Sequence, residues 1–231
     1  MSVPEKDLEK IMKIKKKELH PLISKLKKKH KISTKTLFYM KEYGPHSNIF
    51  GTIMKESLKV LIIDSIISSF GGLALENVKD LLISITPLII LLPTLNDMIG
   101  NYGTIISSRF STMLHEGCIK GKCLKNKDLK KLLVQIFIIA IITALISSTL
   151  SLIISYFSGF QPSTSMIIKI IGIALINTIL LMTLVSLSSI TLGLYFYRKG
   201  EDPSNLLIPI TTSVADLGNM IILTLLILVF F

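Results

Sequence analysis

Three carboxylates lie inside long apolar stretches of this 231-residue chain: Asp64, Asp97 and Asp216. An ionised carboxylate at the centre of a bilayer costs roughly 2.5–3.5 kcal/mol on the insertion scale, so such a group is expected to face protein or water. Carboxylate oxygens are also the ligands that hard cations such as Mg²⁺ and Ca²⁺ prefer. If the surrounding stretches are membrane helices, these residues are candidates for contact with a cation in the bilayer.

Asp216 belongs to a polar face of the last apolar stretch. The spacing of this face is +4, +3, +4 and +3, which places its members on one side of a helix: Asn205, Pro209, Thr212, Asp216 and Asn219. A hydroxyl, a carboxylate and an amide on one face offer oxygen ligands to a hard cation. We therefore predict that this face contacts the ion.

Asp97 heads a second polar face, 119 positions earlier than Asp216 in the chain. Its members again share one side of a helix: Asp97, Asn101, Thr104, Ser108 and Ser111. Gly100 and Gly103 lie beside it, and glycines there let a neighbouring helix or a hydrated ion approach the backbone closely. We predict that these residues line the same pathway.

The composition is that of an α-helical integral membrane protein. Mean hydropathy is +0.63, and no residue is charged within 132–168 or within 170–197. Apolar runs longer than about 18 residues indicate membrane-spanning helices. We predict a domain over residues 51–231 with five spans, at about 58–75, 81–113, 132–157, 165–197 and 203–231. Pro87 and Pro93 are expected to kink the second span, and Pro203, preceded by Asp202 as N-cap, to begin the fifth.

The basic residues separate cleanly in this five-span arrangement. Of the 26 lysines and arginines, 24 fall on one side, in residues 1–59, in the loop 115–131, or at Arg109, Arg198 and Lys199. Lys79 and Lys169 alone lie near the other side. By the positive-inside rule the N-terminus is predicted inside and the C-terminus outside the cell membrane. The same rule accounts for the net charge of +11 without nucleic acid as a partner.

Residues 1–50 form a separate lysine-rich extension. Its leucines, isoleucines and lysines follow a rough amphipathic helical pattern, interrupted at Pro21. Lysines near an anionic membrane surface contribute about 1 kcal/mol each, so we predict that this cytosolic extension binds anionic lipid headgroups. The alternative is a plug or gate beneath the pathway.

The second and fifth stretches resemble the membrane domain of MgtE-type magnesium channels and of the related solute carrier family 41. In the second stretch the matching segments are Gly-Asn-Tyr-Gly at 100–103 and Ser-Arg-Phe-Ser-Thr at 108–112. In the fifth they are Asp-Pro-Ser-Asn at 202–205, Pro209, Thr211, Thr212 and Asp216. The resemblance covers about residues 56–231, including the order of five spans with the N-terminus inside.

The resemblance implies a homodimer whose pore runs along the two-fold axis between the second and fifth spans of both copies. Asp216 matches the pore carboxylate on which Mg²⁺ binding depends in that family, Asn101 matches the wall of the second span, and Thr212 and Asn219 would flank the ion. Asp97 is an addition to the family pattern and is predicted to add a second cation contact. In place of the family's cytosolic magnesium-sensing regions stands the extension of residues 1–50, so their gating is not carried over.

Two other functions remain open from the sequence, and a third, enzyme activity, lacks the residues that it needs. Asp64 or Asp97 would suit an ion-coupled exchanger, because either carboxylate can carry a sodium ion or a proton. An accessory subunit would scatter its polar residues toward a partner instead of aligning them on single faces. An enzyme would need a catalytic or metal constellation. The one cluster of such residue types, His115, Glu116, Cys118 and Cys123, has no strong zinc spacing, so we predict no enzyme activity.

Overall fold

The computed structural model describes residues 49–115, 126–198 and 203–231, and all regular structure within them is helical. The helices are α4 (Ile49–Glu76), α5 (Lys79–Ser84), α6 (Thr86–His115), α7 (Lys127–Phe157), α8 (Thr164–Arg198) and α9 (Pro203–Phe230). The predictions for residues 1–48, for Asp202 and for the loop residues Glu116, Cys118 and Cys123 lie outside the described residues.

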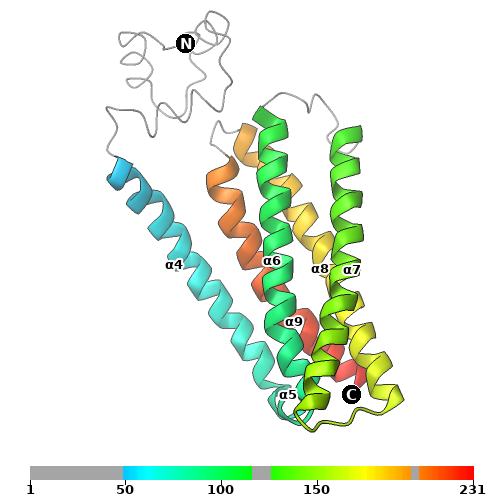
Figure 1. Cartoon of the computed structure of the whole chain (residues 1–231). Coiled ribbons are helices and arrows are strands. Elements are labelled where there is room, and N and C mark those ends of the chain that lie inside the picture. Colours follow the sequence, from blue (N-terminus) through cyan, green and yellow to red (C-terminus); the bar gives the residue numbers. More distant parts are fainter. Residues whose placement is uncertain (1–48, 116–125, 199–202) are drawn as a thin grey trace, which may run out of the picture.

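Consecutive long helices alternate in direction (Figure 1). The N-terminal ends of α4, α7 and α9 therefore lie at the same end of the molecule as the C-terminal ends of α6 and α8. Helices α6, α7, α8 and α9 form a bundle, and α4 packs on α9 while slanting away from the bundle toward its own N-terminus.

Local sequence signals fix the helix ends. Asn126 caps α7, because its Oδ1 accepts hydrogen bonds from the backbone N–H groups of Asp128 and Leu129 at 2.8 and 3.2 Å. At the other end Gly159 adopts a left-handed φ of 89°. The N–H of Phe160 then reaches the carbonyl of Ser155 at 3.0 Å, a Schellman ending that glycine permits at this position. Helix α9 begins at Pro203, as predicted.

The predicted second span of 81–113 is not one helix. It is divided between α5 and α6, with Ile85 outside helical geometry at φ −113° and ψ 81°. A proline ring clashes with the carbonyl four residues earlier and disfavours helical geometry just before it. Pro87 therefore begins a new helix in its first turn instead of kinking a continuous one. Pro93, by contrast, lies inside α6.

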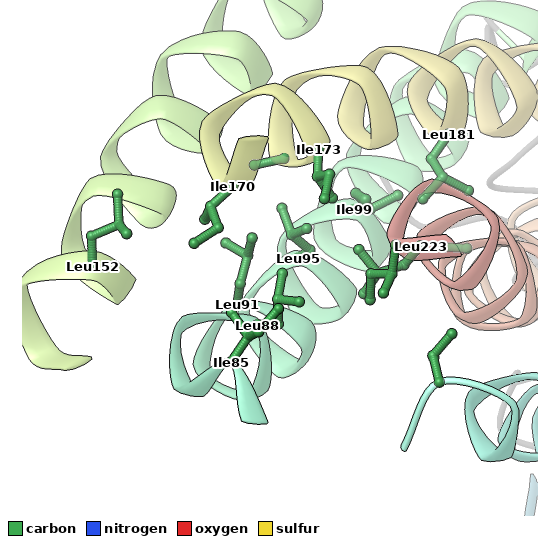
Figure 2. Close-up of a cluster of buried hydrophobic side chains, with 14 of the residues drawn as sticks. Ile85, Leu88, Leu91, Leu95, Ile99, Leu152, Ile170, Ile173, Leu181 and Leu223 are labelled. Atoms are coloured by element: carbon green, nitrogen blue, oxygen red, sulfur yellow. The ribbon is translucent and has the colours of Figure 1, made fainter. Parts of the chain in front are cut away.

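The largest buried cluster joins α6, α8 and α9. One face of α6 supplies Leu88, Leu91, Leu95 and Ile99, all with no exposed surface, and α8 supplies Ile170 and Ile173. Figure 2 shows these side chains gathered between the helices, with Leu152 of α7 at the edge. Close packing here places α6 and α9 side by side and fixes the relation between their polar faces.

Within the described part of the chain, three helical segments are long and apolar enough to cross a membrane: Lys127–Phe157, Thr164–Tyr197 and Leu206–Phe230. Large apolar side chains remain exposed along them, including Ile138, Ile142 and Ile146 on α7. The predicted ranges 58–75 and 81–113 fall on α4 and on α5 with α6, which are not among these three segments.

Candidate functional site

A cleft of about 400 Å³ lies between α6 and α9. Its lining joins the two polar faces picked out by the sequence: Leu92, Pro93, Asn96, Asp97, Gly100, Asn101, Thr104, Thr212, Asp216 and Met220. Six of these are predicted site residues, namely Asp97, Gly100, Asn101, Thr104, Thr212 and Asp216. The structure thus brings together two carboxylates that are far apart in the sequence.

Asp97 and Asn101 form the outer edge of the cleft. Both side chains are exposed, and the Nδ2 of Asn101 donates to the Oδ2 of Asp97 at 3.0 Å across one turn of α6. The second oxygen of the Asp97 carboxylate and the side-chain oxygen of Asn101 take no part in this bond and remain acceptors. The edge therefore presents oxygen acceptors to the cleft and to its surroundings.

Asp216 lies deeper, partly buried on α9. Its Oδ1 accepts a hydrogen bond of 2.7 Å from the Nδ2 of Asn96 on α6. Among the described residues its Oδ2 has no side-chain donor, so this oxygen is left for a ligand in the cleft.

The two threonine hydroxyls of the cleft also present oxygen. Thr104 donates its proton to the carbonyl of Gly100 at 3.1 Å, and Thr212 donates to the carbonyl of Ile208 at 2.9 Å. A hydroxyl that gives its proton to its own helix keeps its lone pairs for a cation or for the protons of a bound water.

Behind Asp216 three carboxamides form a chain of hydrogen bonds across three helices. Asn177 on α8 donates to the Oδ1 of Asn219 at 2.7 Å, and Asn219 donates to the Oδ1 of Asn96 at 3.1 Å. Asn96 in turn donates to Asp216. Asn177 and Asn219 are fully buried. We call Asn177, Asn219 and Asn96 the amide relay.

Other predicted site residues are not brought to the cleft. Asn219, predicted to flank the ion, is buried between Asn96 and Asn177, so its oxygen already accepts a hydrogen bond. Gly103 is buried, and a Cβ at this position would lie only 3.0 Å from Val185 Cγ1 on α8. This glycine therefore allows α6 and α8 to pack closely. Ser108 and Pro209 are not lining residues either. The side chain of Asn205 lies outside the described residues.

Asp64 takes a different position. It extends from α4 and accepts a hydrogen bond from the hydroxyl of Ser213 on α9. This hydroxyl shares its single proton with the carbonyl of Pro209, 3.0 Å away. Asp64 does not line the cleft. It joins α4 to the helix that carries Asp216.

Sequence reasoning missed Asn96, Asn177 and Met220. The polar face predicted for α6 begins at Asp97 and does not include its neighbour Asn96. Asn177 did carry a signal, because it is the sole carboxamide in the apolar stretch 165–197. A lone amide in such a helix is expected to bond to a neighbouring helix. Its partner, however, depends on how α8 packs against α9.

The cleft suits a hydrated cation. Its polar lining supplies carboxylate, carboxamide and hydroxyl oxygens, and none of its ten residues is basic. Six waters occupy about 180 Å³ at about 30 Å³ each, so a cleft of about 400 Å³ admits an ion with its hydration shell. In the part of the chain that the structure describes, no three histidine, cysteine, aspartate or glutamate side chains form a dehydrating metal cage.

Residues 92–226, more than half of the chain, match the MgtE family, described as a divalent cation transporter. The chain belongs to the MgtE family. The match confirms the resemblance seen in the second and fifth stretches, and it includes all ten residues that line the cleft. Searches of curated proteins and of solved structures give no match.

Membership of the MgtE family indicates the general function of the chain. The family consists of divalent cation transporters and is not a family of enzymes. Together with the three long apolar helical segments, membership indicates a membrane protein. The acidic cleft lies within the matched region, on the two helices that carry its polar faces.

Proposed function

We propose that this MgtE-family protein carries Mg²⁺ across the cell membrane through a pore lined by α6 and α9 of two copies. One observation carries the proposal: Asp97 and Asp216 lie in one cleft with oxygen-bearing side chains and no basic residue. Two carboxylates without a basic neighbour attract a divalent cation more strongly than a monovalent one.

Mg²⁺ fits this cleft through its water shell. The ion requires octahedral geometry at about 2.0–2.1 Å and gives up its waters reluctantly. Asp216 offers one free oxygen, and Thr212 and Asn101 each offer a single oxygen from another side chain of the lining. Such separated acceptors suit the protons of bound waters better than direct chelation of a bare ion.

A second copy would complete the pathway. In the single chain the cleft opens past Asp97 and Asn101, which are exposed. Facing lipid, a carboxylate at mid-membrane costs roughly 2.5–3.5 kcal/mol. When the same face of a second copy packs against this one, the two faces enclose a water-filled path and the carboxylates no longer face lipid. Asp97 and Asp216 of both copies then place four carboxylates around the two-fold axis.

The topology that we propose has five spans, with α4 and α6 as the remaining two. Lys127, Lys130 and Lys131 lie at the N-terminal end of α7, the same end of the bundle as the N-terminus of α4, whereas Lys79 and Lys169 lie at the other end. The positive-inside rule then assigns the basic end to the cytosol.

Uptake through this pore requires no chemical fuel. A divalent ion gains roughly 4.6 kcal/mol per 100 mV of inside-negative potential, twice the value for one charge. An ion-coupled exchanger is the second candidate, and the observation that favours it is the additional carboxylate of Asp64 at the contact of α4 with α9.

Flux in proteoliposomes tests the ion and its pathway. We expect Mg²⁺ to enter down its gradient, with Na⁺ excluded and with Mn²⁺, Co²⁺ and Ca²⁺ competing to different extents. A Na⁺ flux equal to the Mg²⁺ flux, or Mg²⁺ entry that requires a Na⁺ or proton gradient, would contradict a magnesium channel.

Cross-linking tests the dimer. In a background with Cys118 and Cys123 replaced by serine, Asn101→Cys is expected to form a disulfide-linked dimer, because residue 101 faces the proposed two-fold axis. Ile142→Cys, exposed on α7, is the matched control and should stay monomeric on a denaturing gel. Equal cross-linking of both variants would argue against a two-fold axis beside the cleft.

A further inference from the structure

The amide relay is directed at the carboxylate of Asp216. An ionised carboxylate only accepts hydrogen bonds, so Asn96 must turn its NH₂ group toward Asp216 and its oxygen away. That oxygen then requires a donor, which fixes the orientation of Asn219, and the oxygen of Asn219 requires the NH₂ of Asn177. The charge on Asp216 thus sets the orientation of three side chains on α6, α9 and α8.

With the three amides oriented in this way, one buried oxygen is left without a hydrogen-bond donor. The Oδ1 of Asn177, at the far end of the relay, is fully buried and has no hydrogen-bond partner among the described residues. Burying an amide oxygen without a donor is unfavourable. An apolar side chain at position 177 would avoid the penalty, so simple packing of α8 on α9 does not explain an asparagine there.

We infer that Asn96 is a positioning residue for the Asp216 carboxylate, and that Asn219 and Asn177 hold Asn96 in the orientation this requires. The inference rests on the proposed function, in which Asp216 contacts the ion. Asn219 and Asn177 lie outside the cleft and act through Asn96.

The consequence is selectivity for a hydrated ion. With Oδ1 held by Asn96, Asp216 presents Oδ2 alone and accepts from one water of the shell. Ca²⁺ readily takes a carboxylate through both oxygens, whereas Mg²⁺ keeps its waters. A carboxylate released from the relay can turn both oxygens to the ion, which favours Ca²⁺ over Mg²⁺.

Asn177→Leu tests the relay at the end farthest from the cleft, since leucine is close to asparagine in shape but has no donor. Thr178→Val is the matched control, because Thr178 is the next residue of α8, is equally buried, and has a hydroxyl without a partner in the described chain. Both variants are measured as the full chain in proteoliposomes. The half-saturating Mg²⁺ concentration, the maximal flux and the inhibition by Ca²⁺ are compared.

We expect Asn177→Leu to raise the half-saturating Mg²⁺ concentration by roughly tenfold, the low end of the loss seen when a partner of a metal ligand is removed. Inhibition by Ca²⁺ should strengthen, and maximal flux should persist. Thr178→Val should match the wild type. If leucine prevents folding, Asn177→Ser, which is too short to reach Asn219, is expected to produce the same two shifts.

Two results would overturn the relay alone. One is an unchanged half-saturating concentration and unchanged Ca²⁺ inhibition in the leucine and serine variants. The other is a lower maximal flux with both quantities unchanged, which is the signature of a purely structural asparagine. In either case, loss of flux in Asp216→Asn would leave the proposed function intact. Wild-type flux in Asp216→Asn would overturn both, because the relay would have no ion-binding carboxylate to position.

Discussion

Asn96 and Asp216, 120 positions apart in the sequence, are joined by a 2.7 Å hydrogen bond between α6 and α9. The bond ties the most deeply placed carboxylate of the cleft to the helix that forms the opposite wall. It also links the cleft to the buried core, because Asn96 is held by Asn219 and, through it, by α8. The geometry of the acidic cleft therefore depends on residues that line it and on residues that do not.

Asp97 is predicted to attract the ion from the edge of the cleft. Asp97→Asn keeps the shape of the side chain and removes one charge. Because Asp97 is exposed, its interaction with a cation is screened, and we expect the half-saturating Mg²⁺ concentration to rise by only about two- to fivefold. Flux titrations at two ionic strengths measure the effect, which should shrink as salt rises. Superimposable titrations of the variant and wild type would make Asp97 a structural residue.

Asp64 is predicted to join helices and not to contact the ion. In Asp64→Asn the amide oxygen can still accept from Ser213, so the link between α4 and α9 is kept and we expect Mg²⁺ flux within about twofold of the wild type. The measurement is Mg²⁺ flux with and without Na⁺ and proton gradients. Should the wild type respond to one of these gradients and Asp64→Asn not respond, Asp64 would be the coupling site of an exchanger.

Gly193 is predicted to be essential for packing of α8. A Cβ at this position would lie 2.7 Å from the Cε1 of Phe110, whose ring is fully buried, and 3.1 Å from Leu207 Cδ1. Gly193→Ala should therefore destabilise the protein by about 1–3 kcal/mol, as overpacked cores do. Thermal unfolding in detergent measures this loss.

Gly172→Ala on the same helix is the control for Gly193→Ala, since its Cβ would meet Phe230 Cε1 at an ordinary 3.8 Å. Its unfolding temperature should equal or slightly exceed the wild-type value, because alanine is favoured over glycine inside a helix. Equal unfolding temperatures for the two alanine variants would show that a methyl group at position 193 fits beside Phe110 without overpacking.

The sequence was sufficient to find the helices and most of the cleft, because both depend on periodicity. Asp97, Asn101 and Thr104 repeat at helical spacing, as do Thr212 and Asp216, so each face is visible in one helix alone. Apolar length likewise predicts α7, α8 and α9. The start of α9 at Pro203 followed from local chemistry as well.

The amide relay was not predictable in the same way. A periodic pattern shows which residues share a face, but not which helix that face contacts. Asn219 shares the polar face of Asp216, yet it is buried against Asn177 and Asn96 instead of facing the cleft. The break at Ile85 was missed for another reason: a proline near a helix start either kinks or interrupts the helix, and packing decides which.

The central claim is that Asp216 contacts the transported ion. Asp216→Asn preserves the shape of the side chain and removes its charge. The Mg²⁺ flux of this variant in proteoliposomes is the measurement, and dimer content is checked by cross-linking in a separate variant that also carries Asn101→Cys. We predict that the variant folds, remains dimeric and loses Mg²⁺ flux. A folded variant that carries Mg²⁺ at the wild-type rate and with the wild-type half-saturating concentration would contradict the claim.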